Sequence, residues 1–249
     1  MEKAARRVAL VTGAARGIGF AIAQRLAADG CQVVLADASA DVRAAAGRLE
    51  AADGLELDVS DEAAIASAMR EVVSRCGSID ILVNNAGISG RRGTAATPVV
   101  ELDTETWERV MAVNFTGSFL MCKACIPAMR ARKWGRIVNM ASQAARTRSD
   151  ATNPHYATSK AALIGFSRSL ALEVAGDGIT VNCVAPGRIR TEMTAKMGEA
   201  ADRAYAARSA VGRVGEPGDI AAAVAFLASE RASFITGTTL DVNGGASML

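Results

Sequence analysis

Short apolar runs alternate with longer amphipathic stretches along nearly the whole chain. The apolar runs lie at 8–11, 32–37, 55–57, 79–83, 135–140, 180–184 and 238–242, and most have the length of buried strands. Stretches with helical spacing or helix-start residues separate them, at 20–28, 41–51, 60–76, 101–132, 157–172 and 217–228. The pattern therefore predicts an α/β fold, a doubly wound parallel sheet of about seven strands with helices on both faces.

Glycines and polar residues gather where the predicted strands end. They are Gly13, Asp37, Asp58, Asn85, Ser142 and Pro186. Ligands of open parallel sheets bind outside the carboxyl ends of the strands. We therefore expect a ligand site along this edge of the sheet.

The first strand end is a glycine-rich turn. Residues 12–19 have the sequence TGAARGIG and lead into an amphipathic run. Strand, glycine turn and helix in this order suit a pyrophosphate, because the helix N-terminus offers unpaired N–H groups. The glycine spacing differs from the commonest dinucleotide fingerprint, so taken alone the turn is about as often an ordinary one.

An acid at the end of the second strand bears on the choice of dinucleotide. Asp37 stands where such folds place a carboxylate on the adenosine ribose. It would repel the extra phosphate of NADP by on the order of 1–4 kcal/mol, which favours NAD. Arg16 points the other way, since it could pair with that phosphate, although it could equally pair with Asp37 or lie in solvent.

A tyrosine and a lysine four residues apart are the candidate acid/base pair. Tyr156 and Lys160 stand at the start of the predicted helix 157–172, where this spacing puts both on one face. An ammonium within ~4–6 Å favours a phenolate and lowers the pKa of the tyrosine from its usual ~10. The spacing also arises by chance, so the pair alone is weak evidence.

Composition favours one domain and a small-molecule partner. The chain has 249 residues, half of them hydrophobic, and we expect residues 1–249 to form a single domain. A net charge of +2 gives no reason to expect nucleic acid or an anionic membrane surface. We find no signal peptide and no apolar run near the ~18 residues of a membrane span, so we expect a cytoplasmic protein. The five cysteines suit reduced core thiols, and no metal site is indicated.

Taken together, these motifs resemble the short-chain dehydrogenase/reductase family over essentially the whole chain. They are TGxxxGIG at 12–19, NNAG at 84–87, Asn114, Ser142, Tyr156-x-x-x-Lys160, Pro186-Gly187 and Thr191. The resemblance implies one Rossmann domain that binds NAD or NADP, usually in a homotetramer.

The resemblance also implies roles for individual residues. Tyr156 would be the general acid/base, and Lys160 would lower its pKa and hold the nicotinamide ribose. Ser142 would hydrogen-bond the reacting oxygen, and Asn114 would hold a water that passes protons to Lys160. Besides Tyr156 and Lys160, the cofactor would meet Gly13, Arg16, Gly17, Ile18, Gly19, Asp37, Asp58, Val59, Asn85, Ala86, Gly87, Pro186, Gly187, Ile189 and Thr191.

Within the family, the chain looks most like 3-oxoacyl-acyl-carrier-protein reductases and NAD-dependent polyol or sugar dehydrogenases. The former mostly use NADPH and keep a basic residue for the acidic carrier where this chain has Gly176-Asp177, although Arg130 and Arg132 could serve the other carrier contact. Our leading expectation is an NAD-dependent dehydrogenase of a polyol, sugar or hydroxy acid. The alternatives are an NADPH-dependent 3-oxoacyl-acyl-carrier-protein reductase and an inactive dinucleotide sensor.

Arginines near the expected pocket suggest an anionic substrate. They are Arg91, Arg92, Arg146, Arg148, Arg188 and Arg190. One or two could bind a carboxylate, sulfonate or phosphate, but they could equally face solvent or pair with acids. His155 could also reach the substrate, and residues 190–213 are expected to form a mobile flap over it.

Overall fold

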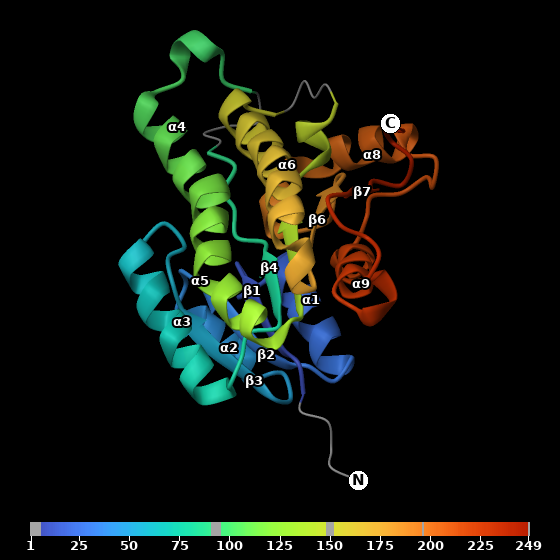
Figure 1. Ribbon diagram of the computed structural model, residues 1–249. Helices are drawn as coiled ribbons and strands as arrows, with labels where there is room; N and C mark the ends of the chain where they lie inside the picture. The colour runs from blue at the N-terminus through green and yellow to red at the C-terminus, as the bar shows by residue number, and fades with distance from the viewer. Residues whose placement is uncertain (1–5, 91–95, 148–151, 196, 249) are drawn as a thin grey trace.

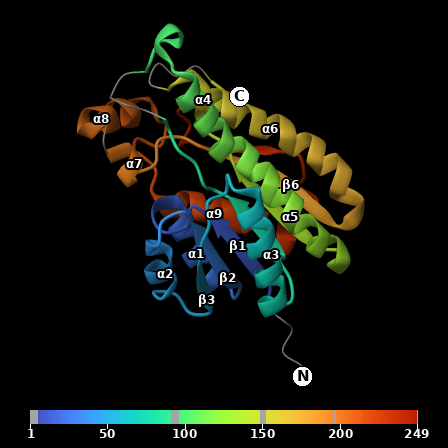
Figure 2. The same cartoon turned by 90° about the vertical axis from the view of Figure 1, so that its left-hand side faces the viewer.

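Seven parallel strands form one sheet in the computed structural model, which describes residues 6–90, 96–147, 152–195 and 197–248. Their order is β3-β2-β1-β4-β5-β6-β7, and helices cover both faces (Figures 1 and 2). The strands are β1 (Val8–Thr12), β2 (Gln32–Asp37), β3 (Ala52–Glu56), β4 (Ile81–Asn84), β5 (Gly135–Met140), β6 (Ile179–Pro186) and β7 (Thr239–Val242). The predicted α/β fold with a doubly wound parallel sheet is confirmed.

The helices divide between the two faces because alternate residues of each strand point in opposite directions. Ala9 and Val11 pack with α1 (Gly17–Ala28), α2 (Asp41–Ala46) and α9 (Pro217–Leu227). Val8 and Leu10 pack with α3 (Glu62–Cys76), α5 (Gly117–Arg132) and α6 (Pro154–Val174). Strands buried on both faces must be apolar throughout, which is why they read as continuous hydrophobic runs.

Strand order reverses between β1 and β4, and this reversal determines where the expected ligand site lies. The chain runs outward from β1 to β2 and β3, then returns to pair β4 with the other side of β1. Val11 is in register with both Leu35 and Val83, so the three strands end at the same level. Side chains that follow these ends are therefore neighbours around one crevice.

Two predicted boundaries are wrong for reasons of packing. Helix α2 ends at Ala46 instead of 51, and β3 begins at Ala52 instead of 55. Its Asp53-Gly54 pair has low strand propensity, but it continues the parallel register with β2. A Cβ on Gly54 would lie 2.6 Å from the Cα of Arg43, so close packing of α2 requires glycine there.

Other differences concern helices. The predicted helix 101–132 is divided into α4 (Thr104–Met111), a π-helical turn (Ala112–Thr116) and α5. Helix α6 begins at Pro154 and not 157, because proline suits the first helical turn. Residues 190–213 contain α7 (Glu192–Ala195) and α8 (Gly198–Arg208), so this flap segment has helical structure that its weak periodicity did not predict.

One helical stretch has the length and composition of a membrane span, contrary to our expectation. Thr104–Arg132 meets both criteria, but 56% of its most apolar part is buried inside the fold. Its residues Met121, Cys125 and Met129 lie in the core between the sheet and α3. We therefore interpret it as a core helix.

A buried carboxylate organises the edge of the sheet opposite the strand ends that form the crevice. Asp80 is inaccessible to solvent and accepts hydrogen bonds from the Val8 N–H (2.8 Å) and the Ser78 hydroxyl (3.0 Å). Arg132 lies 3.0 Å from it and Arg7 3.8 Å from it, so two cations compensate its charge.

We expect Asp80→Ala to destabilise the protein by about 3 kcal/mol, because it leaves buried donors without their acceptor. Urea unfolding measures the change. Glu71→Ala removes the exposed pair with Arg75 and is the control, with an expected loss below about 0.5 kcal/mol. Equal losses in the two variants would contradict this role of Asp80.

Candidate active site

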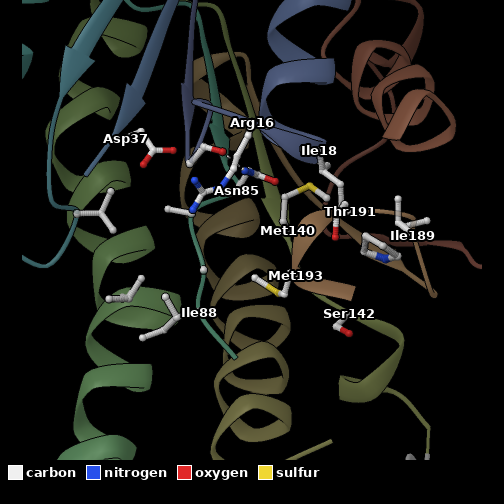
Figure 3. A pocket seen from close by; sticks show the side chains of 18 of the residues that line it. Arg16, Ile18, Asp37, Asn85, Ile88, Met140, Ser142, Ile189, Thr191 and Met193 are labelled. Atoms are coloured by element: carbon white, nitrogen blue, oxygen red, sulfur yellow. Dashed lines mark hydrogen bonds between the residues drawn. The ribbon is translucent and has the colours of Figure 1, made fainter. Parts of the chain in front are cut away.

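A cavity of about 400 Å³ follows the carboxyl ends of β1, β2, β4, β5 and β6. Figure 3 shows several of its side chains, with Asp37 on one side and Ser142 on the other. All seventeen predicted cofactor residues line it: Gly13, Arg16, Gly17, Ile18, Gly19, Asp37, Asp58, Val59, Asn85, Ala86, Gly87, Tyr156, Lys160, Pro186, Gly187, Ile189 and Thr191. The structure therefore brings the whole predicted set to one pocket; the role of each residue stays a prediction.

The glycine turn is shaped by close contacts that exclude side chains. Gly13 and Gly17 have positive φ angles of 63° and 57°, and a Cβ on Gly19 would clash with the carbonyl of Gly13. Asn85 donates to the carbonyls of Thr12 and Gly13, each at 2.9 Å. The turn is thus held open at the start of α1, whose N-cap residue has no side-chain cap bond. These features fit a pyrophosphate at the free N–H groups of the helix.

Asp37 is held in place by the backbone beside the pocket. One carboxylate oxygen accepts from the Ala15 N–H and the other from the Ser39 N–H, each at 3.0 Å. Arg16 does not pair with it; the guanidinium lies 3.4 Å from the carboxylate of Glu192, and both side chains are exposed. The acid at the end of β2 is therefore fixed, while the arginine is engaged with the flap segment.

Helix α6 places the two candidate acid/base residues in the pocket wall. Lys160 is buried and donates a hydrogen bond to the main-chain oxygen of Met140 at 2.8 Å. Its Nζ lies 5.9 Å from the centre of the Tyr156 ring. Burial lowers the pKa of Lys160 to about 8.

The pKa of Tyr156 moves in the direction opposite to our expectation. The side chain is half-buried in the pocket wall, and desolvation raises the pKa of Tyr156. A hydrogen bond with Ser142 lowers it in part. Desolvation is the larger of these two effects, and a lowering of the Tyr156 pKa by Lys160 stays a prediction.

Ser142 follows β5 and faces this pair. Its backbone is extended, and its Oγ accepts a hydrogen bond from the Ala144 N–H at 3.2 Å. The Ser142 side chain both lines the pocket and hydrogen-bonds Tyr156. This geometry places Ser142 where a substrate oxygen can contact both hydroxyl groups.

Asn114 lies behind the pocket and not in its lining. It sits in the π-helical turn, and its amide accepts from the Ile88 N–H (2.8 Å) and donates to the Ile88 carbonyl (3.0 Å). The same amide nitrogen lies 3.1 Å from the hydroxyl of Ser159. Its side chain therefore clamps the segment after β4 against α6, and the proton relay stays a prediction.

The predicted substrate arginines are engaged with acids in the described part of the chain. Arg146 lies 3.2 Å from Asp241, and Arg188 is paired with Asp202. Neither arginine lines the cavity. Both are paired with acids, which is the alternative that the sequence left open, and they are therefore not free to bind an anion. Arg190 is likewise paired, 2.9 Å from Glu216. Arg91, Arg92 and Arg148 lie outside the described residues.

His155 does not reach the pocket either. It is completely buried, and its Nε2 lies 3.1 Å from the main-chain oxygen of Ser89. It therefore joins the start of α6 to the segment after β4, which is a structural contact.

Sequence reasoning missed several lining residues, among them Arg109, Ile88, Met140 and Met193. Arg109 is the most informative because it brings a cation to the part of the pocket near Asp58. The pKa of Asp58 is lowered, mainly by hydrogen bonds from Ser60 and in smaller part by Arg109. Helical spacing could have indicated Arg109, because it lies one turn before Val113, which also lines the cavity.

We expect Lys160→Met to raise the free energy of unfolding at pH 7 by on the order of 1–3 kcal/mol. The pKa of Lys160 is about 8 in the folded protein and near 10.5 when unperturbed, so below pH 8 folding buries a charge. Between these values only the unfolded chain binds the proton, and the native protein regains stability as pH rises. Urea unfolding at pH 7 and 9.5 measures the difference in free energy of unfolding between Lys160→Met and the native protein. We expect this difference to be smaller at pH 9.5. An equal difference at both pH values would contradict the lowered pKa of Lys160.

Comparisons with known proteins agree with this arrangement. Residues 13–247 match the family model described as Enoyl-(Acyl carrier protein) reductase. The 3-oxoacyl-[acyl-carrier-protein] reductase of Escherichia coli K12 is 43% identical over 250 residues, covering 98% of each chain. That of Aquifex aeolicus is 42% identical, covering 96% of each.

A solved structure is also similar. The 3-oxoacyl-[acyl-carrier protein] reductase of Brucella melitensis superposes with a TM-score of 0.93 at 38% identity, covering 98% of this chain and 92% of that one. With the pocket at the strand ends and the serine, tyrosine and lysine in its wall, the chain belongs to the short-chain dehydrogenase/reductase family of oxidoreductases.

Proposed function

We propose that the chain reduces a 3-oxoacyl thioester to the 3-hydroxyacyl thioester. The observation that carries this proposal is its similarity, at 42–43% identity and nearly full length, to proteins named 3-oxoacyl-[acyl-carrier-protein] reductase. It replaces a polyol, sugar or hydroxy acid as the leading substrate class. The pocket supports it, because Ser142, Tyr156 and Lys160 lie together beside the cofactor residues.

The ionisation of the site is compatible with reduction. Because burial raises the pKa of Tyr156, its hydroxyl stays protonated at neutral pH and is able to give a proton to a developing alkoxide. Ser142 would hold the substrate carbonyl oxygen beside that hydroxyl. Lys160, with a pKa of about 8, would return a proton to Tyr156 after each turnover. The bound dinucleotide supplies the hydride to the carbonyl carbon.

We propose NADH as the preferred reductant, on the evidence of Asp37. Its carboxylate is fixed by two backbone N–H groups and lines the pocket, where ribose hydroxyls would be acceptable and a 2′-phosphate would be repelled. Arg16, the cation of the glycine turn, is engaged with Glu192. A 2′-phosphate would have to compete with that acid for the guanidinium.

A small hydroxy compound is the second candidate substrate, and one surface observation favours it. Arg130 donates to Asp177 at 2.7 Å and to Glu173 at 3.1 Å, and Arg132 lies against the buried Asp80. An acidic carrier protein would have to compete with these acids for the two arginines that we expected at the carrier contact. A substrate without such a carrier would meet no such competition.

We further propose that residues 1–249 act as one catalytic domain with the flap segment 190–213 over the substrate, in a cytoplasmic homotetramer. The exposed side chains of Phe226, Phe234 and Leu240 support assembly, because they leave apolar surface uncovered on α9, β7 and the connection between them. The five free cysteines suit a reducing compartment.

The substrate class is tested by oxidation of reduced dinucleotide with a 3-oxoacyl thioester of coenzyme A, the same acyl group on an acyl carrier protein, and a panel of polyols and hydroxy acids assayed in reverse. We expect turnover of the thioesters and a loss of at least about 10³-fold in kcat for Tyr156→Phe, because the proton donor is removed. The dissociation constant of the dinucleotide, measured by nicotinamide fluorescence, should stay within about threefold and serves as the folding control. Turnover of polyols alone would establish the second candidate.

The cofactor preference is tested with Asp37→Asn, which keeps an oxygen acceptor for the backbone and removes the charge. We expect native protein to bind NADPH at least about tenfold more weakly than NADH, and the variant to regain about tenfold for NADPH. Asp41→Asn, the control, removes a negative charge from the exposed start of α2 and should change the dissociation constant of neither NADH nor NADPH. Tighter binding of NADPH by the native protein would overturn the assignment to NADH.

A further inference from the structure

One side chain of the flap segment reaches two distant parts of the fold. Tyr205 is the buried residue of α8, with only 7% of its surface exposed. Its hydroxyl oxygen lies 3.1 Å from the side-chain amide of Gln143 and 2.9 Å from the main-chain oxygen of Asn243. Gln143 directly follows Ser142, and Asn243 directly follows β7. Tyr205 therefore connects the flap segment both to the turn that carries the serine and to the edge of the sheet.

The two contacts are chemically compatible. Burial raises the pKa of Tyr205, so the hydroxyl keeps its single proton, which it donates to the carbonyl of Asn243. The oxygen of Tyr205 can then accept a hydrogen bond from the Gln143 amide when its NH₂ group faces the ring, an orientation that the hydrogen-bond network selects. Both bonds are satisfied in this arrangement.

The surrounding packing is built to admit this hydroxyl. A Cβ on Gly187 would overlap the hydroxyl oxygen of Tyr205, so this pocket-lining position must be glycine while the helix is seated. Asp202 stands three residues before Tyr205 on α8, on the same side of the helix, and pairs with Arg188. Two side chains of α8 thus hold it on the body of the protein.

We propose that Tyr205 is a positioning residue that couples the seating of the flap segment to the orientation of Ser142. The connection passes through Gln143 to the short helical turn Gln143–Ala145, whose Ala144 N–H donates to the Ser142 hydroxyl at 3.2 Å. When α8 lifts, Gln143 loses its partner and this turn loses its support. Ser142 is then aligned with Tyr156 only while the flap segment is seated. The proposal rests on the proposed function in that it assigns Ser142 to the reacting oxygen.

The first test is hydrogen exchange in Tyr205→Phe, which removes only the hydroxyl. The control is Ser209→Ala, which removes another hydroxyl bond between the flap segment and the C-terminal part of the chain, from Ser209 to the Gly244 carbonyl (2.9 Å). We expect Tyr205→Phe to speed exchange at least about threefold in both 198–208 and 142–147, and Ser209→Ala to speed it in the flap segment alone. Unchanged exchange in 142–147 in Tyr205→Phe would overturn the proposal.

The second test is kinetic. For Tyr205→Phe we expect kcat to fall about five- to tenfold, the effect of losing one uncharged hydrogen bond, with the KM of the dinucleotide unchanged. Gln143→Ala should give the same fall, and the double variant should be no worse than either single one. Altered exchange with unchanged kcat would overturn the positioning role. If the native protein turns over no thioester, the proposed function fails, whereas the exchange measurement still decides the coupling.

Discussion

Four hydrogen bonds between the ends of β1 and β4 hold the glycine turn, and the pocket depends on them. The Thr12 hydroxyl accepts from the N–H groups of Asn85 and Ala86, and the Asn85 amide donates to the carbonyls of Thr12 and Gly13. They form because the parallel register ends both strands at one level. The turn then directs the first N–H groups of α1 toward the space where a pyrophosphate would bind.

Desolvation governs the chemistry on the other side of the pocket. It lowers the pKa of Lys160 and raises that of Tyr156, so both residues are driven toward their uncharged forms. The opposite shifts separate the two pKa values, so the transfer of a proton from Lys160 to an ionised Tyr156 is favourable in free energy. Tyr156 therefore stays protonated at neutral pH. It needs added positive charge nearby before it becomes a strong base.

The sequence was sufficient for the features that depend on local pattern. Buried parallel strands are apolar throughout, and their ends carry glycines and amides, so the sheet could be predicted from runs, and the residues that line the pocket from motifs and the family resemblance. The start of β3 escaped prediction because its Asp53-Gly54 is held by pairing with β2 and by close packing of α2. The partners of Arg146 and Arg188 could not be foreseen, since each ion pair joins segments that meet only in the folded chain. The contact between Tyr205 and Gln143 is of the same kind.

The ion pair between Arg16 and Glu192 joins two segments of the pocket lining, the glycine turn and the flap segment. Both side chains are exposed, so the pair contributes little to stability, and dissolved salt screens it. It nevertheless lies in the lining of the pocket where we expect a dinucleotide to bind. The rate at which oxidised dinucleotide is replaced by reduced dinucleotide should therefore rise with ionic strength. The rate of proton transfer between the buried groups should not change with it.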